Sequence, residues 1–168
     1  MSGLFVLGGA RSGKSRYAQA RAEALGNLRC FIATAQAFDD EMRHRIARHQ
    51  ADRGEGWLTV EEPFDLAEAI AAESSPDRVL VVDCLTLWTT NLLLAEHDIA
   101  AATGEVIDAL GEATGPVILV ANEVGQGIVP DNALARRFRD EAGLVNQRVA
   151  AAVEEVQLMI AGLPLKLK

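Results

Sequence analysis

Apolar runs of strand length alternate with helical patterns along this chain. The runs are rich in β-branched residues and show little alternation of apolar and polar positions, which is typical of strands buried on both faces of a parallel sheet. They span residues 4–7, 30–34, 57–61, 79–83, 117–121 and 156–162. Helical periodicity fills the remaining segments, namely 15–25, 39–53, 63–73, 85–96, 99–113 and 134–156, with Gly143 as a potential break.

This order of elements predicts an α/β fold with a mostly parallel sheet, because parallel neighbours are joined by right-handed crossover helices. The chain has 168 residues, which suits one domain covering 1–168. The final segment, GLPLKLK at 162–168, is expected to turn back as a small hairpin at the edge of the sheet.

A phosphate-binding motif stands at the first strand–helix junction. The segment GGARSGKS at 8–15 matches G-x-x-x-x-G-K-[ST], follows a predicted strand and opens a predicted helix. Its glycines allow backbone N–H groups to converge on phosphate oxygens, and Lys14 can reach the β and γ phosphates. Thirteen of the sixteen basic residues are arginine, and Lys14 is the only lysine before Lys166. A plain glycine turn is the alternative, but this context favours a P-loop nucleotide-binding protein.

An acidic residue ends the apolar run at 79–83. In a P-loop protein, a strand-end aspartate such as Asp83 joins the hydroxyl of Ser15 in holding Mg²⁺ beside the phosphates. Taken alone, a strand-end aspartate is more often a helix cap, and it is the phosphate loop that favours the metal-binding role of Asp83.

The basic residues of this acidic chain gather in one short segment. The formal net charge is −8, yet residues 40–53 hold four arginines and two histidines. On a helix, Arg45, Arg48, His49 and Arg53 share one face. Nearby cations favour the neutral imidazole of His49, which is a nucleophile, and the same arginines can stabilise charge on a phosphorus under attack. The segment is therefore either a solvated charged face or a covalent nucleotidyl-transfer site.

The sequence argues against nucleic-acid binders, switch GTPases, secreted proteins and membrane proteins. The acidic balance argues against a nucleic-acid partner, and no lysine is available for the N-K-x-D motif of switch GTPases. No apolar run approaches membrane-spanning length, and the first fifteen residues lack the features of a secretory signal. We therefore expect a cytoplasmic protein without membrane insertion. A small-molecule kinase, a nucleotidyl transferase and an ATPase subunit remain open.

Several blocks, in order, resemble one enzyme family from end to end. The blocks are GGARSGKS, IATAQAFDDEMRHRIARHQADR, W-x-T-V-E-E-P, DCLTLWTTNLL, NEVGQGIVPDNALARRFRDEAGLVNQRVA and VQLMIAGLPLKLK. Together they are similar to the bifunctional adenosylcobinamide kinase / adenosylcobinamide-phosphate guanylyltransferase family. This resemblance implies a RecA-like sheet order and a homotrimer.

The resemblance also implies two reactions. ATP or GTP phosphorylates the aminopropanol hydroxyl of adenosylcobinamide, and GTP then donates GMP through a guanylyl-histidine to the substrate phosphate, giving adenosylcobinamide-GDP. The family's histidine falls on His49, whereas His44 is expected at the surface. Its nucleotide contacts fall on Gly8, Gly9, Ala10, Arg11, Ser12, Gly13, Lys14, Ser15, Thr34, Ala35, Gln36, Gln50, Ala51, Asp52, Arg53, Glu61 and Asp83.

A glycine-containing loop is expected after the strand at 117–121. There Asn122 and Glu123 can meet the corrinoid side chain or the metal, and the arginines of the next helix can pair with phosphate or a neighbouring subunit. A turn followed by a solvated helix is the alternative. For the whole chain, two rival functions stay open: a P-loop kinase without guanylyltransferase activity, and a non-catalytic nucleotide-binding subunit.

Overall fold

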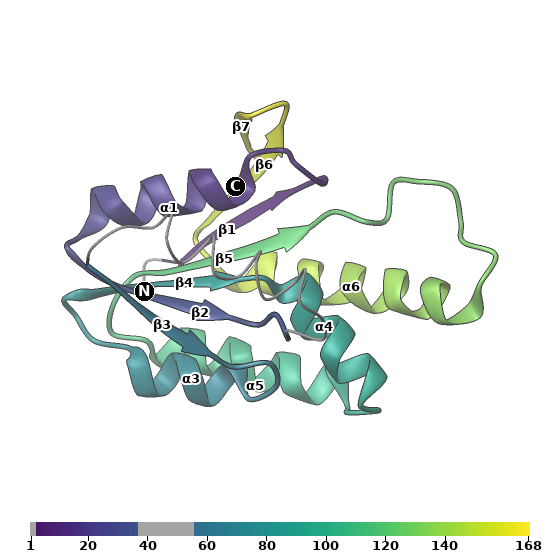
Figure 1. The fold of residues 1–168 in the computed structure, drawn as a ribbon, viewed down its shortest axis with the longest axis horizontal. Helices are drawn as coiled ribbons and strands as arrows, with labels where there is room; N and C mark the ends of the chain where they lie inside the picture. Colours follow the sequence, from purple (N-terminus) through teal and green to yellow (C-terminus); the bar gives the residue numbers. More distant parts are fainter. Residues whose placement is uncertain (1–2, 37–55) are drawn as a thin grey trace.

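Seven strands form one sheet in the computed structural model, which describes residues 3–36 and 56–168 (Figure 1). The strand order is β3-β2-β4-β5-β1-β6-β7. The strands are β1 (Gly3–Gly8), β2 (Leu28–Ala33), β3 (Trp57–Glu61), β4 (Arg78–Asp83), β5 (Val117–Asn122), β6 (Glu155–Ile160) and β7 (Leu163–Lys166). All neighbours pair in parallel except β6 and β7. The expected α/β sheet and its C-terminal hairpin are therefore confirmed.

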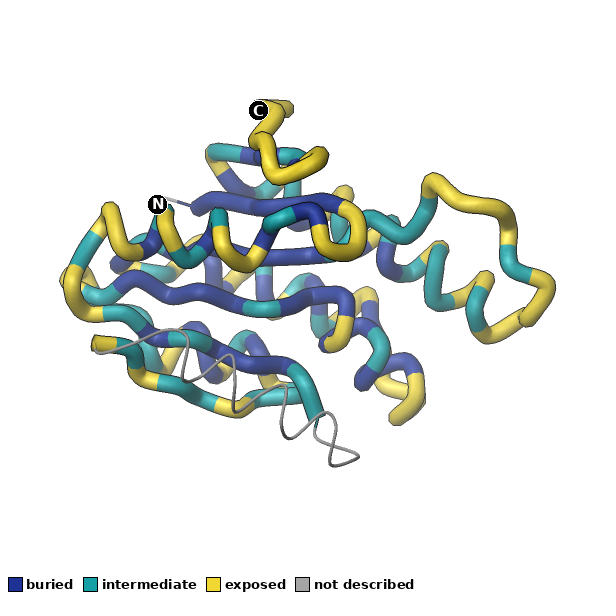
Figure 2. The backbone as a smooth tube through the Cα atoms, turned by 45° about the horizontal axis from the view of Figure 1, so that its top comes forward, coloured by how far each residue is buried: buried dark blue, intermediate teal, exposed yellow. Residues whose placement is uncertain are grey.

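Helices cover both faces of the sheet (Figures 1 and 2). Helix α1 (Lys14–Leu25) packs on one face through Ala18 and Ala22. The opposite face is covered by α3 (Leu66–Glu73), α4 (Leu85–Leu94), α5 (Ile99–Glu112) and α6 (Ala133–Ala152). Within β1, Leu4 and Val6 face α1, whereas Phe5 and Leu7 face the other core. Burial on both faces explains why the strands show almost no apolar–polar alternation.

The last helix differs from its sequence-based prediction. Helix α6 runs through Gly143 without a break and ends at Ala152, not at residue 156. Val156 instead belongs to β6, where it pairs with Phe5 of the buried strand β1. Tertiary pairing thus overrides the helical periodicity at this point. The turn between β6 and β7 has Ala161 and Gly162 at φ 52° and 82°.

The parallel register brings the carboxyl ends of β1 to β6 to one edge of the sheet, where α/β proteins bind ligands. The predicted helix at 39–53 lies outside the described residues. Within the described part of the chain, no helix is long and apolar enough to span a membrane.

Candidate nucleotide-binding site

The GGARSGKS segment forms the connection between β1 and α1. Gly13 precedes the helix at φ 95°, a conformation that L residues rarely adopt. At Gly8 a Cβ atom would lie 2.7 Å from the carbonyl oxygen of Met159, so this position has no room for a side chain. Arg11 also has a positive φ, 54°, inside the turn. The backbone therefore takes the curved path that turns N–H groups toward an anion at the start of a helix.

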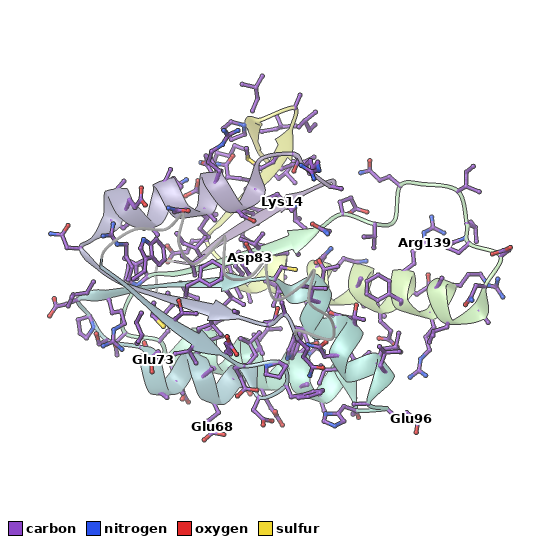
Figure 3. The ribbon with its side chains drawn as sticks, in the orientation of Figure 1. Lys14, Glu68, Glu73, Asp83, Glu96 and Arg139 are labelled. Atoms are coloured by element: carbon purple, nitrogen blue, oxygen red, sulfur yellow. The ribbon has the colours of Figure 1, made fainter. Side chains whose placement is uncertain are left out.

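Lys14 lies at the start of α1 with its ammonium group over the loop (Figure 3). Its Nζ donates a hydrogen bond of 2.6 Å to the carbonyl oxygen of Gly9, and the residue is 8% exposed. Burial lowers the pKa of Lys14, whereas the carboxylate of Asp83 raises it. The loop thus holds a partly desolvated positive charge, and low solvation strengthens its attraction for phosphate.

Ser15 and Asp83 are the expected magnesium ligands. Ser15 is the second residue of α1 and is exposed. Asp83 ends β4 at the same edge of the sheet (Figure 3), and the charge of its carboxylate raises the pKa of Lys14 against the effect of burial. No group of three His, Cys, Asp or Glu residues able to hold a metal occurs among the described residues. A hydroxyl and a carboxylate still fit Mg²⁺, which takes few protein ligands and completes its octahedron with phosphate and water oxygens.

Thr34, Ala35 and Gln36 follow the carboxyl end of β2. Thr34 is fully buried and its hydroxyl is used within the fold, so its place among the nucleotide contacts stays a prediction. Its hydroxyl donates to the carbonyl oxygen of Cys84 at 2.7 Å and accepts from the amide of Cys84 at 2.8 Å. Ala35 and Gln36 are half-buried and continue from this anchored position.

Glu61 ends β3 in register with Ala33 and is exposed. Its neighbour Glu62 has a structural role instead, since its Oε1 accepts from the amides of Phe64 and Asp65. Four strand spacings separate β1 from β3, which places Glu61 about 19 Å from the phosphate loop at about 4.8 Å per spacing. The candidate contacts therefore lie along one edge rather than in one small pocket.

Helix α4 supplies positioning residues that the sequence-based reasoning missed. The Nδ2 atom of Asn91 donates to the carbonyl oxygens of Thr34 and Pro63, at 2.8 and 3.0 Å. The indole N–H of Trp88 donates to the carbonyl of Phe64, and the hydroxyl of Thr86 accepts from the amide of Asn122. One helix thus fixes the ends of β2, β3 and β5. The sequence signal for these positioning residues is that Thr86 and Asn91 are polar residues in the otherwise apolar helix α4.

The loop between β5 and α6 is held by arginines of α6. Arg139, labelled in Figure 3, donates to the carbonyl of Gly125, and Arg136 donates to the carbonyls of Pro130 and Asp131. The guanidinium groups expected to pair with phosphate or a neighbouring subunit therefore have backbone partners in the loop. The amide of Glu123 donates to the carbonyl of Gly8 at 3.0 Å, which joins this loop to the phosphate loop.

Cys30 and Cys84 are buried free thiols, and burial raises the pKa of each to about 11. The remaining candidate residues, His49, Gln50, Ala51, Asp52 and Arg53, lie outside the described residues. Their roles stay predictions.

Comparison with known proteins decides the family. The model of the cobinamide kinase / cobinamide phosphate guanyltransferase family matches residues 4–167. The chain belongs to this family.

Relatives of the cobinamide kinase / cobinamide phosphate guanyltransferase family match over nearly their full length. The bifunctional adenosylcobalamin biosynthesis protein CobP of Pseudomonas aeruginosa is 50% identical, with 97% of this chain and 95% of that protein covered. The bifunctional adenosylcobalamin biosynthesis protein CobU of Escherichia coli K12 is 43% identical, with 98% and 99% covered. The family assignment therefore extends over the whole chain.

Solved structures with a similar fold are ATPases and a recombinase. An ATPase from the type III secretion system of pathogenic bacteria has a TM-score of 0.57 at 10% identity, with 94% of this chain and 50% of that chain covered. The RadB recombinase has a TM-score of 0.51 at 13% identity, with 94% and 73% covered. At such low identity these likenesses support the P-loop fold of this cobinamide kinase family member and nothing further.

Proposed function

We propose that this chain phosphorylates adenosylcobinamide with a nucleoside triphosphate and then transfers GMP from GTP to the resulting phosphate. Adenosylcobinamide-GDP is the product. The observation that carries this proposal is the match to the cobinamide kinase / cobinamide phosphate guanyltransferase family over residues 4–167. The phosphate loop with Lys14 supplies the triphosphate site that both reactions need.

The proposed nucleotide lies along the carboxyl edge of the sheet. Its β and γ phosphates occupy the loop at Gly8–Ser15, and its base lies toward Glu61, whose carboxylate can accept from the N–H edge of guanine. The span of about 19 Å between these ends suits an extended GTP molecule. Its α phosphorus then lies over the intervening strands, toward Thr34.

The proposed guanylyl transfer proceeds in two displacements. A ring nitrogen of neutral His49 attacks the α phosphorus, and the bond to the bridging oxygen breaks, so pyrophosphate leaves. An oxygen of the substrate phosphate then attacks the same phosphorus and releases the imidazole. The connection that includes His49 leaves the sheet at the end of β2, next to Thr34. Arg45, Arg48 and Arg53 are the proposed stabilisers of charge at this phosphorus.

Mg²⁺, held by Ser15, Asp83 and phosphate oxygens, is the proposed metal ion, and it neutralises charge on the triphosphate. ATP and GTP are both proposed donors for the kinase step. A homotrimer in the cytoplasm is the proposed state of the protein, and the resemblance to the family is what supports it.

Labelling with GTP that carries ³²P at the α position tests the covalent step. Wild-type protein should acquire an acid-labile label that chases into adenosylcobinamide-GDP. His49→Ala should remain unlabelled, whereas the matched control His44→Ala should label normally. An unlabelled wild type that still phosphorylates adenosylcobinamide would mean a kinase without transferase activity. A purified chain with neither activity would mean a nucleotide-binding subunit.

A further inference from the structure

A pocket of about 440 Å³ opens beside the phosphate loop and shares residues 9–12 of that loop with the proposed triphosphate site. Three segments line it: residues 9–12 of the phosphate loop, residues 123–127 of the loop after β5, and residues 158–161 at the end of β6. Strand β6 adjoins β1 on the side opposite β5. The pocket therefore lies on the side of the phosphate loop that faces away from the strands of Asp83 and Glu61.

We propose that this pocket is the acceptor site of the phosphoryl-transfer step, and that Glu123 acts there as the general base. This inference rests on the proposed function and names the residues that receive the aminopropanol arm. The γ phosphate belongs in the first half of the phosphate loop, and that half, residues 9–12, is also a wall of the pocket. An acceptor hydroxyl in the pocket approaches the γ phosphorus from the side opposite the leaving diphosphate, as in-line transfer requires.

The walls of the pocket suit a short arm with an amide link. Val124, Leu158 and Ile160 offer apolar surface, and Gln126 offers an amide that can both donate and accept hydrogen bonds. The volume fits the aminopropanol arm and leaves the corrin ring outside, against Ile160, which is 55% exposed. The hydroxyl of Ser12 is a further group without a protein partner: the residue is 8% exposed and its Oγ makes no hydrogen bond. The Ser12 Oγ itself is buried, so it meets a ligand oxygen only after its side chain rotates, and its lack of a partner favours such a rotation.

Glu123 is the carboxylate of the pocket, and two hydrogen bonds fix its position. Its backbone amide donates to the carbonyl of Gly8, and its Oε1 accepts from the amide of Gly125 at 2.6 Å. The carbonyl of Gly125 in turn accepts from Arg139. No described residue donates to the other carboxylate oxygen, Oε2. One oxygen is thus anchored while the other remains available to a hydroxyl in the pocket.

The proposed step balances without a further reactant. The acceptor hydroxyl oxygen bonds to the γ phosphorus, and the bond between that phosphorus and the β–γ bridging oxygen breaks. The nucleoside diphosphate leaves with the electron pair, and the hydroxyl proton passes to Oε2 of Glu123. Guanylyl transfer needs no such base, because its acceptor is a phosphate oxygen that is already ionised.

This difference between the two acceptors provides the decisive experiment. Glu123→Gln preserves an oxygen that accepts from Gly125 and removes the basic carboxylate. Its kcat for phosphorylation of adenosylcobinamide should fall about 100-fold or more. Its rate of GMP transfer to supplied adenosylcobinamide phosphate should stay within about threefold of wild type, and Glu112→Gln should match wild type in both assays. Unchanged kinase activity in Glu123→Gln would overturn the role of the base, and so would an equal loss of both activities.

A second variant tests the pocket by filling it. Val124→Trp should raise the dissociation constant for adenosylcobinamide, followed by equilibrium dialysis of the coloured corrinoid, about tenfold or more. Its affinity for GTP should be unchanged, and Val129→Trp on the same loop, outside the pocket, should bind both ligands like wild type. Weakened GTP binding with normal corrinoid binding would overturn the pocket assignment. A wild type that binds no adenosylcobinamide would instead count against the proposed function itself.

Discussion

Thr34 and Cys84 exchange two hydrogen bonds through a single hydroxyl. The Thr34 Oγ1 donates to the carbonyl oxygen of Cys84 and accepts from its amide, at 2.7 and 2.8 Å. These residues directly follow β2 and β4, so the contact joins two neighbouring strands where the proposed nucleotide crosses them. The hydroxyl replaces the backbone partners that the strands no longer supply beyond their ends.

Removing this hydroxyl should destabilise the fold. Thr34→Val keeps the shape of the side chain and leaves the buried amide of Cys84 without a partner, while the Cys84 carbonyl keeps only its bond from the Trp88 amide. We expect a cost of about 1–3 kcal/mol in the free energy of unfolding. Thr34→Ser retains the hydroxyl and should lose about 1 kcal/mol or less. Urea denaturation measures both. Equal stability of Thr34→Val and wild type would show that these two hydrogen bonds do not contribute to the free energy of unfolding.

Asn91 should affect guanylyl transfer although it is buried beneath the proposed nucleotide site. Asn91→Ala removes the donors to Thr34 and Pro63 and frees the ends of β2 and β3, so we expect a loss of about 1–3 kcal/mol in stability. The KM for GTP in the transfer assay should rise severalfold, because these strand ends carry Gln36 and Glu61. Thr90→Ala, on the same helix, serves as the control. A stability loss without any change in KM would limit Asn91 to a purely structural role.

Lys14 should contribute most of the affinity for triphosphate. Lys14→Met keeps an unbranched side chain and removes the charge, so the dissociation constant for Mg-GTP should rise about 100-fold, the value of a charge-assisted hydrogen bond. Isothermal titration calorimetry measures this change. Lys166→Met, which removes an exposed lysine from β7, should bind normally. Binding of GTP by Lys14→Met at wild-type affinity would contradict the assigned phosphate site.

The ion pair between α1 and β6 should make stability depend on acid pH. Arg21 forms two hydrogen bonds of 2.8 Å with Glu155, which lowers the pKa of Glu155 to about 2. The pKa is depressed in the folded state, so the stabilisation is complete above the unfolded value, about 4.5, and is lost as the pH falls toward 2. Both side chains are about one-third exposed, and we therefore expect only about 1 kcal/mol at pH 7.

Glu155→Gln measures this contribution. The difference in urea midpoint between wild type and Glu155→Gln should be largest at pH 7 and narrow steadily below about pH 5. A difference that is the same at pH 7 and pH 3.5 would mean that packing, not charge, accounts for the effect of the substitution.

The sequence predicted the strands well because each is an uninterrupted apolar run buried on two faces. The predicted strand at 57–61 matches β3 at both ends. The C-terminal hairpin was predicted from the segment 162–168, which contains β7. The predicted end of the last helix was wrong because Val156 pairs with Phe5 of β1, although the local periodicity is helical. Glycine spacing and the isolated lysine located the phosphate loop, since local backbone geometry determines that motif.

The positioning residues could not be predicted in the same way. Thr34, Asn91 and Thr86 act through backbone groups that are distant in sequence, and only the strand order β2-β4-β5 brings these groups together. Their buried polarity was visible in the sequence, but their partners were not. The arginines of the helix after this loop were likewise expected to pair with phosphate or a neighbouring subunit, whereas Arg136 and Arg139 donate to carbonyls of the loop.

Strand β1 ends in the phosphate loop, but its two neighbours in the sheet, β5 and β6, begin only at Val117 and Glu155. During synthesis, β1 leaves the ribosome long before β5 and β6, so it has no strand to pair with. Without these neighbours, the phosphate loop at the end of β1 cannot adopt its folded conformation. GTP capture should therefore appear abruptly once β6 has emerged. Nascent chains stalled before Glu155 should therefore not bind GTP.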